Sequence, residues 1–323
     1  MLPGAVPALF AAVSLLCVLP SAGGAADRET IGTPRGARVL PRQVATVFGM
    51  DDRREMTTAE RRALRAIGLV RCERDDAPLV TAAIVNVSHI NGNRSFDVIA
   101  TVAHAFYDPW GRRYSNECYF YPQGIFVKAN RVRISHFQVG TRNYNDDSKD
   151  WAVAVIPQRL SARYGSLGYT VLDLKAKAKK TDLKYVFAGL NYRTARIDVS
   201  EKCQAVPKKP AHYLFSDVAT FNHNCDLEVG ASGGPLMVLH GDRYYIVAVQ
   251  AAQVNGAYDL GADGRILVKK HKSDPSSGFD AAFNPNIAVR VDGEFKRTID
   301  AMARSGGIAA KRAPVRTIQV NAQ

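Results

Sequence analysis

The sequence lacks several features that define other classes of protein. It holds only five cysteines in 323 residues, and neither a CxxC nor an HxxxH spacing occurs, so a zinc site is poorly supported. No internal repeat, low-complexity linker or nucleic-acid motif divides the chain. Outside one run near the N-terminus, no segment is apolar enough to span a bilayer. We therefore expect no metal, no cofactor and no specific nucleic-acid partner.

Charge is absent from the first 26 residues, which hold an apolar run at 5–19 followed by small residues. This pattern is typical of a secretory signal peptide over 1–26, and the alternative is an uncleaved membrane anchor. The run is short for a span. Cleavage would leave no transmembrane anchor and would place the protein in the periplasm or outside the cell. Residues 27–46 follow as an N-terminal arm or propeptide.

Four cysteines remain after removal of this segment: Cys72, Cys118, Cys203 and Cys225. An even number in an exported chain indicates two disulfides, for which three connectivities exist. We favour Cys72–Cys118 and Cys203–Cys225, because each of these pairs is local to its half of the chain.

The net charge of +13 is concentrated in part at two places. A lysine cluster lies at 175–180, and a basic tail at 304–323 has four positive charges and no acidic residue (Arg304, Lys311, Arg312, Arg316). Such a balance favours anionic surfaces. A solvated face and a solvated tail are the simpler interpretation, since no motif supports a particular anionic partner.

Long helical patterns are scarce, and short strand-like segments dominate. An Asn91-Gly92 pair predicts a hairpin between the first two of these segments. One helix is predicted at 293–304, with Phe295, Ile299 and Met302 on one face. Many short strands with turns between them predict an all-β barrel or sandwich. The segments are 79–90, 96–103, 125–132, 151–156, 184–189, 235–239 and 244–251.

A serine flanked by glycines stands out in the stretch GASGGPL, where Ser232 follows Gly230 and Ala231. Small neighbours let the backbone turn tightly, expose the serine Oγ and direct N–H groups at a developing oxyanion. The stretch therefore predicts a nucleophile, and the alternative is a glycine-rich turn between two strands.

A serine nucleophile needs a base, and the base needs an acid that orients it. His104 is the candidate base because it directly follows an apolar strand-like run. Asp150 is the candidate acid because it immediately precedes the apolar run at 151–156. Asp146 and Asp147 are interpreted as solvated turn residues.

The segments TVAHAF, KDWAVAVI and GASGGPL, in the order His, Asp, Ser, resemble the three catalytic motifs of trypsin/chymotrypsin-like serine proteases. The match covers residues 47–295. The opening VFGMDDR and the sequence HNCD at 223–226 resemble the bacterial exported branch that includes glutamyl endopeptidases. The resemblance implies an all-β fold of two perpendicular six-stranded antiparallel β-barrels with a C-terminal helix and a site in the cleft between the barrels.

The resemblance also implies the role of each residue. His104 and Asp150 come from the first barrel and Ser232 from the second; His104 accepts the Ser232 proton, Asp150 fixes the imidazole tautomer, and the N–H groups of Gly230 and Ser232 form an oxyanion hole. The protease domain would cover 47–303, with the barrel boundary near 157–168. The chain is expected to be a monomeric, exported serine endopeptidase that hydrolyses proteins or peptides through an acyl-enzyme.

Two other functions compete with this prediction. A catalytically silent relative could use the fold for binding alone. An α/β-hydrolase esterase also uses a glycine-flanked serine, but in that class the serine comes before the acid and the histidine along the chain.

Three positions bear on activation and specificity. Ala231 stands where animal digestive enzymes carry the acid that pairs with the new N-terminus, so that switch should be absent. Gln250 stands where glutamyl endopeptidases present a histidine to the substrate, which argues against glutamate specificity. Asp226 lies six residues before Ser232 (232 − 226), where an acid forms the base of a pocket for Arg or Lys. Alternatively, Asp226 turns away and hydrogen-bonds its own loop.

Overall fold

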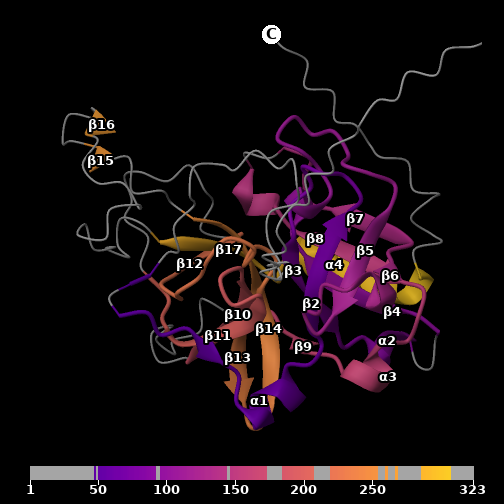
Figure 1. The fold of residues 1–323 in the computed structure, drawn as a ribbon, viewed down its shortest axis with the longest axis horizontal. Helices are drawn as coiled ribbons and strands as arrows, with labels where there is room; N and C mark the ends of the chain where they lie inside the picture. The colour runs from indigo at the N-terminus through magenta and orange to yellow at the C-terminus, as the bar shows by residue number, and fades with distance from the viewer. Residues whose placement is uncertain are drawn as a thin grey trace, which may run out of the picture. The chain divides into compact units, whose positions relative to one another are not determined.

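Two curled antiparallel β-sheets make up most of the described protein (Figure 1). The computed structural model describes residues 47–48, 50–91, 95–143, 146–172, 184–206, 219–253, 259–260, 266–267 and 285–306. These residues all belong to one compact unit, Ile31–Gln323. The predicted signal peptide, the N-terminal arm, the lysine cluster and the tail beyond residue 306 lie outside the described residues.

The first sheet has seven strands in the order β6-β5-β2-β3-β4-β8-β7. Every residue of β3, β4 and β8 is buried, which explains why these strands read as apolar runs without alternation. The strands are β2 (Ile67–Cys72), β3 (Val80–Val85), β4 (Asp97–Thr101), β5 (Cys118–Pro122), β6 (Val132–Arg133), β7 (His136–Val139) and β8 (Ala152–Ile156).

The second sheet has eight strands in the order β1-β11-β10-β13-β14-β17-β12, with β9 paired in parallel to β14. Its strands are β1 (Arg54–Glu55), β9 (Gly168–Tyr169), β10 (Tyr185–Asn191), β11 (Arg196–Cys203), β12 (Thr220–His223), β13 (Pro235–His240), β14 (Arg243–Gln253) and β17 (Asn286–Arg290). A separate two-stranded sheet consists of β15 (Asp259–Leu260) and β16 (Ile266–Leu267). β3 of the first sheet lies against β10 and β13 of the second.

The helices are few and mostly short. The longest, α4 (Gly293–Ser305), lies against β8 and β4 of the first sheet. Its buried face includes Phe295, Ile299 and Met302, and the Phe295 ring stacks on Trp151 with centroids 5.0 Å apart. The helix predicted from this apolar face is therefore confirmed. The others are α1 (Thr58–Ala63), α2 (Ser88–Asn91), α3 (Ser161–Tyr164), η1 (Ala103–Ala105), η2 (Lys128–Asn130) and η3 (Asp147–Lys149).

The all-β fold with a C-terminal helix is as predicted, but several local predictions need correction. The segment 125–132 is not a strand: η2 occupies much of it, and strand structure begins only at Val132. The strand expected to reach residue 90 ends at Val85, and α2 follows it. β3 and β4 do pair antiparallel. The sheets exceed six strands because short strands, such as β6 and β1, extend their edges.

A helix that the sequence analysis missed, α1, has a recognisable start signal. Thr57 caps its N-terminus, with its side chain accepting from the Glu60 N–H while the Glu60 carboxylate accepts from the Thr57 N–H. This reciprocal capping box satisfies two backbone donors that a helix start leaves open. The helix contains only six residues and buries none of them, so its apolar periodicity is weak.

Both favoured disulfides are present in the structure. Cys72 and Cys118 are cross-strand neighbours on β2 and β5, and their sulfur atoms are bonded. Cys203, at the end of β11, is bonded to Cys225 in the loop after β12. Among the described residues, no helix combines the length and apolar character that crossing a membrane requires.

Candidate active site

His104 and Asp150 leave adjacent strands at the same edge of the first sheet. Thr101, the last residue of β4, pairs with Ala152, the first residue of β8. His104 follows Thr101 by three residues and lies in η1, and Asp150 precedes Ala152 by two. Because the end of β4 lies beside the start of β8 in the antiparallel pairing, the two residues meet at the same end of these strands.

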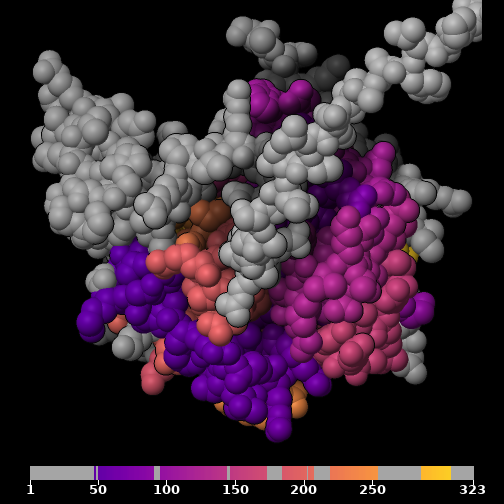
Figure 2. Space-filling model, viewed as in Figure 1, coloured from indigo at the N-terminus to yellow at the C-terminus, as the bar shows by residue number. Residues whose placement is uncertain are grey.

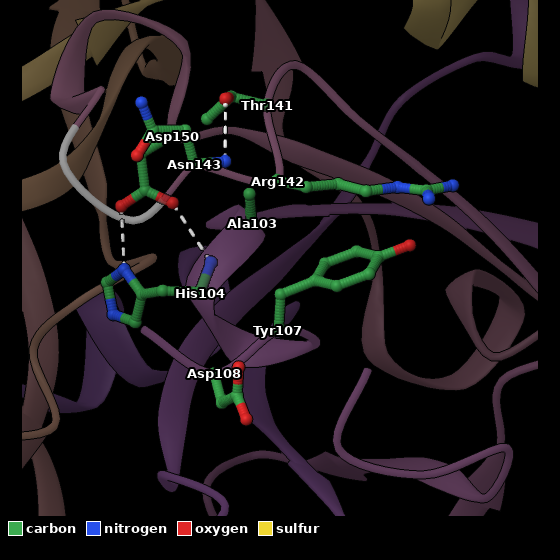
Figure 3. Close-up of a pocket in the computed structure, with 8 residues that line it drawn as sticks. All are labelled: Ala103, His104, Tyr107, Asp108, Thr141, Arg142, Asn143 and Asp150. Carbon is green, nitrogen blue, oxygen red and sulfur yellow. Dashed lines mark hydrogen bonds and ion pairs between the residues drawn. The ribbon is translucent and has the colours of Figure 1, made fainter. Parts of the chain in front are cut away.

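The carboxylate of Asp150 holds His104 at two points (Figure 3). Its Oδ1 accepts a hydrogen bond from the His104 backbone N–H at 2.9 Å, and its Oδ2 lies 2.6 Å from His104 Nδ1. Asp150 is 6% exposed, while the His104 side chain is 15% exposed. This geometry favours a proton on Nδ1, and it leaves Nε2 as the nitrogen that does not face Asp150.

The electrostatic environment favours the protonated form of His104. Burial lowers its pKa, but the charge of Asp150 and the hydrogen bond to it outweigh burial, so the pKa of His104 lies above its usual value. Asp147 contributes in the same direction. Asp147 is itself partly buried rather than solvated, and burial together with the charge of Asp150 raises the pKa of Asp147 to about 6.

A small pocket lies beside this pair. It is lined by residues that flank His104 and by the segment before η3. In Figure 3, Tyr107 and Asp108 lie with His104 below Thr141, Asn143 and Asp150. Asp108 is 1% exposed, and its Oδ1 accepts from the backbone N–H groups of Trp110 and Arg112. The Asp108 carboxylate therefore stabilises its own turn. The lining residues are Ala103, His104, Tyr107, Asp108, Thr141, Arg142, Asn143 and Asp150.

The loop that carries Ser232 is a tight turn before β13. Gly230 and Gly233 have φ angles of +88° and +77°, a region that L side chains rarely adopt. The Gly233 N–H donates to the Gln250 carbonyl at 2.7 Å, and the Gln250 N–H donates to the Gly234 carbonyl at 2.9 Å. A Cβ atom on Gly233 would overlap the carbonyl oxygen of Thr81. The turn therefore requires glycine at this position.

Thr81 of the first sheet binds the Ser232 loop directly. Its backbone N–H donates to the Ser232 carbonyl at 2.8 Å, and its Oγ1 donates to the Gly230 carbonyl at 2.8 Å. The same Oγ1 accepts from the Leu190 N–H at 2.9 Å. The Thr81 carbonyl in turn accepts from the hydroxyl of Thr101, on the strand that leads to His104, at 2.7 Å.

The sequence analysis missed this polar connection between the sheets. Thr81 and Thr101 are fully buried in strands that are otherwise almost wholly apolar. A buried hydroxyl costs free energy unless it is hydrogen-bonded. A lone threonine in an apolar strand therefore indicates that its hydroxyl has a hydrogen-bond partner. Its partners could not be identified from the sequence, because they lie more than 100 residues away.

The N–H groups of Gly230 and Ser232 point to no backbone partner. Within the described part of the chain, neither amide donates a hydrogen bond, whereas Ala231 between them donates to the Glu228 carbonyl at 3.0 Å. Ser232 is only partly buried. Two amide donors, that of Ser232 itself and that of the residue two positions before it, are thus left available for a ligand.

The two residues predicted to line a substrate pocket are buried and hydrogen-bonded internally. Asp226 is 3% exposed, and its carboxylate accepts from the backbone N–H groups of Phe48 at 2.7 Å and Asp52 at 2.8 Å. Gln250 is 2% exposed; its Oε1 lies 2.7 Å from His223 Nε2, and its Nε2 donates to the Ala252 carbonyl at 2.6 Å. Burial raises the pKa of Asp226 to about 6.

His223 differs from His104 in having no acidic partner. It is fully buried, and its Nδ1 accepts from the Cys225 N–H at 3.2 Å while Nε2 donates to Gln250. Burial lowers the pKa of His223 to about 4, so this residue is a neutral structural histidine. Among the described residues, no group of three His, Cys, Asp or Glu side chains could hold a metal ion.

The fold is similar to those of solved serine proteases. A Glu endopeptidase solved in complex with MPD matches with a TM-score of 0.53 at 16% identity, covering 80% of this chain and 99% of that chain. The protease Anisep from Arthrobacter nicotinovorans matches with a TM-score of 0.51 at 16% identity over 75% and 97% of the two chains. A thermostable serine protease, AL20, from an extremophilic microorganism matches with a TM-score of 0.50 at 14% identity over 74% and 97%.

No protein-family model matches the chain, and no curated protein matches it. At identities of 14–16%, the structural likeness establishes the fold and nothing finer. The chain therefore has the chymotrypsin-like fold of two curled β-sheets, the architecture that the three sequence motifs implied.

Proposed function

We propose that this protein is a serine endopeptidase in which His104, Asp150 and Ser232 act as a catalytic triad. The observation that carries the proposal is the two-point hydrogen bonding of His104 by the buried Asp150 carboxylate, in a chain with a serine protease fold. The pKa of His104 is raised by its carboxylate partner, whereas burial lowers the pKa of His223.

In this mechanism His104 takes the proton of the Ser232 hydroxyl as Oγ attacks the scissile carbonyl. Asp150 keeps the Nδ1 proton in place, so Nε2 is the basic nitrogen, and its charge stabilises the imidazolium that forms. His104 then gives the proton to the leaving amine, which leaves an acyl group on Ser232. Water releases that acyl group by the same steps.

The N–H groups of Gly230 and Ser232 would stabilise the negative charge that develops on the carbonyl oxygen. Support comes from the positive φ of Gly230 and from the lack of a partner for either amide in the described part of the chain. Donors that need no reorganisation during the reaction are worth more than donors that must first leave another acceptor.

Peptide or protein substrates and an extracytoplasmic location are part of the same proposal. Two disulfides form and persist in oxidising compartments, which agrees with export through the uncharged N-terminal segment. We propose secretion or residence in the periplasm, with the chain active as a monomer.

A fluorophosphonate probe tests the proposal without knowledge of the substrate, because it labels an activated serine. We expect covalent labelling at Ser232 in the exported chain, detected by peptide mass mapping, and no labelling in Ser232→Ala. A protease-like binding protein would show neither labelling nor turnover of a peptide library, and that pair of results would replace the enzyme with the binding function.

A further inference from the structure

The first described residues form hydrogen bonds and an ion pair with the segment that leads into Ser232. The described residues 47–48 and 50–55, termed here the N-terminal clasp, run beside the second sheet, and in Figure 2 their indigo surface borders the coral and orange surface of that sheet. β1, at the end of the clasp, pairs with β11. The clasp thus belongs to the second sheet although it precedes the whole first sheet in the chain.

Asp226 forms the first contact between this segment and the clasp. Its two carboxylate oxygens bind two different backbone amides of the clasp, those of Phe48 and Asp52. Its own N–H donates to the Ser200 hydroxyl at 3.1 Å, and that hydroxyl donates to Asp52 Oδ1 at 2.7 Å. The two amide N–H groups favour the charged form of Asp226 and offset part of the effect of burial, which raises its pKa to about 6.

Arg53 forms the second contact, an ion pair. Its guanidinium binds Glu228 Oε2 at 2.9 Å and also Asp51, while its side chain is only 5% exposed. The carbonyl of the same Glu228 accepts the Ala231 N–H. Breaking a buried ion pair leaves an uncompensated charge, so Glu228 is fixed between the clasp on one side and the Ser232 loop on the other.

We propose that the N-terminal clasp is a working part of the candidate active site, and that Asp226 is a positioning residue for the Ser232 loop rather than the base of a pocket for basic side chains. This inference rests on the proposed function. Ala231 cannot accept the ion pair that orders this loop in animal digestive enzymes. Asp226 and Glu228 take over that task by binding the clasp through backbone amides and Arg53.

Asp226 is poorly suited to bind a substrate side chain. Both of its oxygens already accept hydrogen bonds from the protein, and only 3% of the residue is exposed. A substrate guanidinium would have to displace the clasp before it could bind bidentately. Specificity for Arg or Lys therefore does not follow from this aspartate.

The test is Asp226→Asn in the full chain, with Asp97→Asn as a matched control. Asp97 is also a buried carboxylate with two hydrogen bonds, from the Ser161 N–H and hydroxyl, but it lies at the start of β4, remote from Ser232 in the first sheet. The new amide in Asp226→Asn keeps one acceptor oxygen and turns N–H groups toward a backbone donor. We expect a fall in kcat of about tenfold to hundredfold with KM within about threefold, less than the loss of a whole oxyanion donor.

Asp97→Asn is expected to lower the melting temperature to a similar extent while kcat stays within about threefold. Equal kcat values in wild type and Asp226→Asn would overturn the inference. So would a wild-type preference for Arg or Lys before the scissile bond that is lost in Asp226→Asn, since that result assigns the carboxylate to the pocket.

Hydrogen–deuterium exchange provides a readout that does not depend on activity. In Asp226→Asn we expect faster exchange both in the clasp and in residues 225–234, and in Asp97→Asn in neither. Faster exchange in the clasp alone would show that it does not order the loop and would contradict the inference. A wild-type chain that is not labelled by fluorophosphonate would refute the proposed function, while the exchange result would still decide whether the clasp holds the loop.

Discussion

The two sheets hold their contributions to the site in different ways. In the first sheet, His104 and Asp150 meet because β4 and β8 are neighbours in register, and one carboxylate orients the imidazole. In the second, the Ser232 loop is bound by Thr81 of the first sheet and by Gln250 of the neighbouring strand β14, and Asp226 and Glu228, which precede the loop, bind the N-terminal clasp. The candidate general base therefore depends on the pairing of two neighbouring strands, whereas the candidate nucleophile depends on contacts with other parts of the fold.

The two histidines of these regions show the consequence. The pKa of His104 is raised because Asp150 offsets the effect of burial, and the pKa of His223 falls to about 4 because nothing charged offsets it. Burial alone would make both histidines neutral structural residues. One adjacent carboxylate distinguishes a candidate catalytic base from a structural residue.

The largest expected effect is the loss of Ser232 or His104 from the proposed triad. Ser232→Ala and His104→Ala should each lower kcat by about 10⁶-fold, and the double variant should lose little more, because the residues act as one unit. Initial rates on a peptide substrate, with the fluorophosphonate label as an active-site titrant, measure this. Substantial activity in Ser232→Ala would end the serine-protease proposal.

Asp150→Asn should come next, with kcat lower by about 10⁴-fold, because the amide no longer favours the Nδ1 proton of His104. The rate should rise as His104 loses its proton, with a midpoint above 6.5 in the wild type and a lower one in Asp150→Asn, where only the charge of Asp147 still opposes the effect of burial. The pH dependence of fluorophosphonate labelling gives both midpoints.

Asp147→Asn is the matched control, since Asp147 lies three residues away and raises the same pKa without a hydrogen bond to His104. It should shift the midpoint slightly downward and leave kcat within about threefold. Equal losses in the two variants would mean that the charge near His104, and not the two-point hydrogen bond, is what matters.

Thr81→Val tests the connection between the two regions. Valine keeps the shape of threonine but leaves the Gly230 carbonyl and the Leu190 N–H without their partner. At about 1–3 kcal/mol for each of the two unsatisfied groups, the free energy of unfolding, measured by urea denaturation, should fall by about 2–6 kcal/mol. Thr101→Val removes one hydrogen bond of the same line and should cost less; an equal or larger cost there would contradict this account.

His223 should produce the smallest effect, visible only in acid. Its folded pKa of about 4 lies below the unfolded value, so the unfolded chain binds the extra proton as the pH falls from about 6.5 to 4. The free energy of unfolding should therefore decrease by up to about 3 kcal/mol as the pH falls across that window. Above pH 6.5 this residue is neutral in both the folded and the unfolded chain and causes no loss of stability. Urea denaturation across this pH range measures the slope.

His223→Gln should flatten that slope, because glutamine does not titrate there. His240→Gln, at an exposed position of β13, should leave it unchanged. A slope that survives in His223→Gln would have to come from other groups, and the contrast between the two buried histidines would then be weaker than proposed.

The sequence was most informative where the relevant contacts are local. The apolar runs of β4 and β8, with His104 after one and Asp150 before the other, predicted the strands and the two residues together, since strand burial and residue position are both visible along the chain. The local cysteine pairing and the amphipathic α4 were predictable for the same reason. The strand prediction at 125–132 was wrong because a 3₁₀ turn at 128–130 interrupts the segment, and Ile125 and Val127 are exposed although their residue types favour strands.

The sequence by itself determined the all-β class, the order His, Asp, Ser and the need for glycine around Ser232. Only the tertiary structure decided what the Asp226 carboxylate and the Thr81 hydroxyl bind, because the partners of these side-chain groups are separated from them by more than 100 residues. The sequence position of a carboxylate, six residues before a serine, does not distinguish a carboxylate that faces a substrate from one that binds a backbone amide. The free energy of burying that charge is compensated by the N-terminal clasp, and no pattern along the chain records that contact.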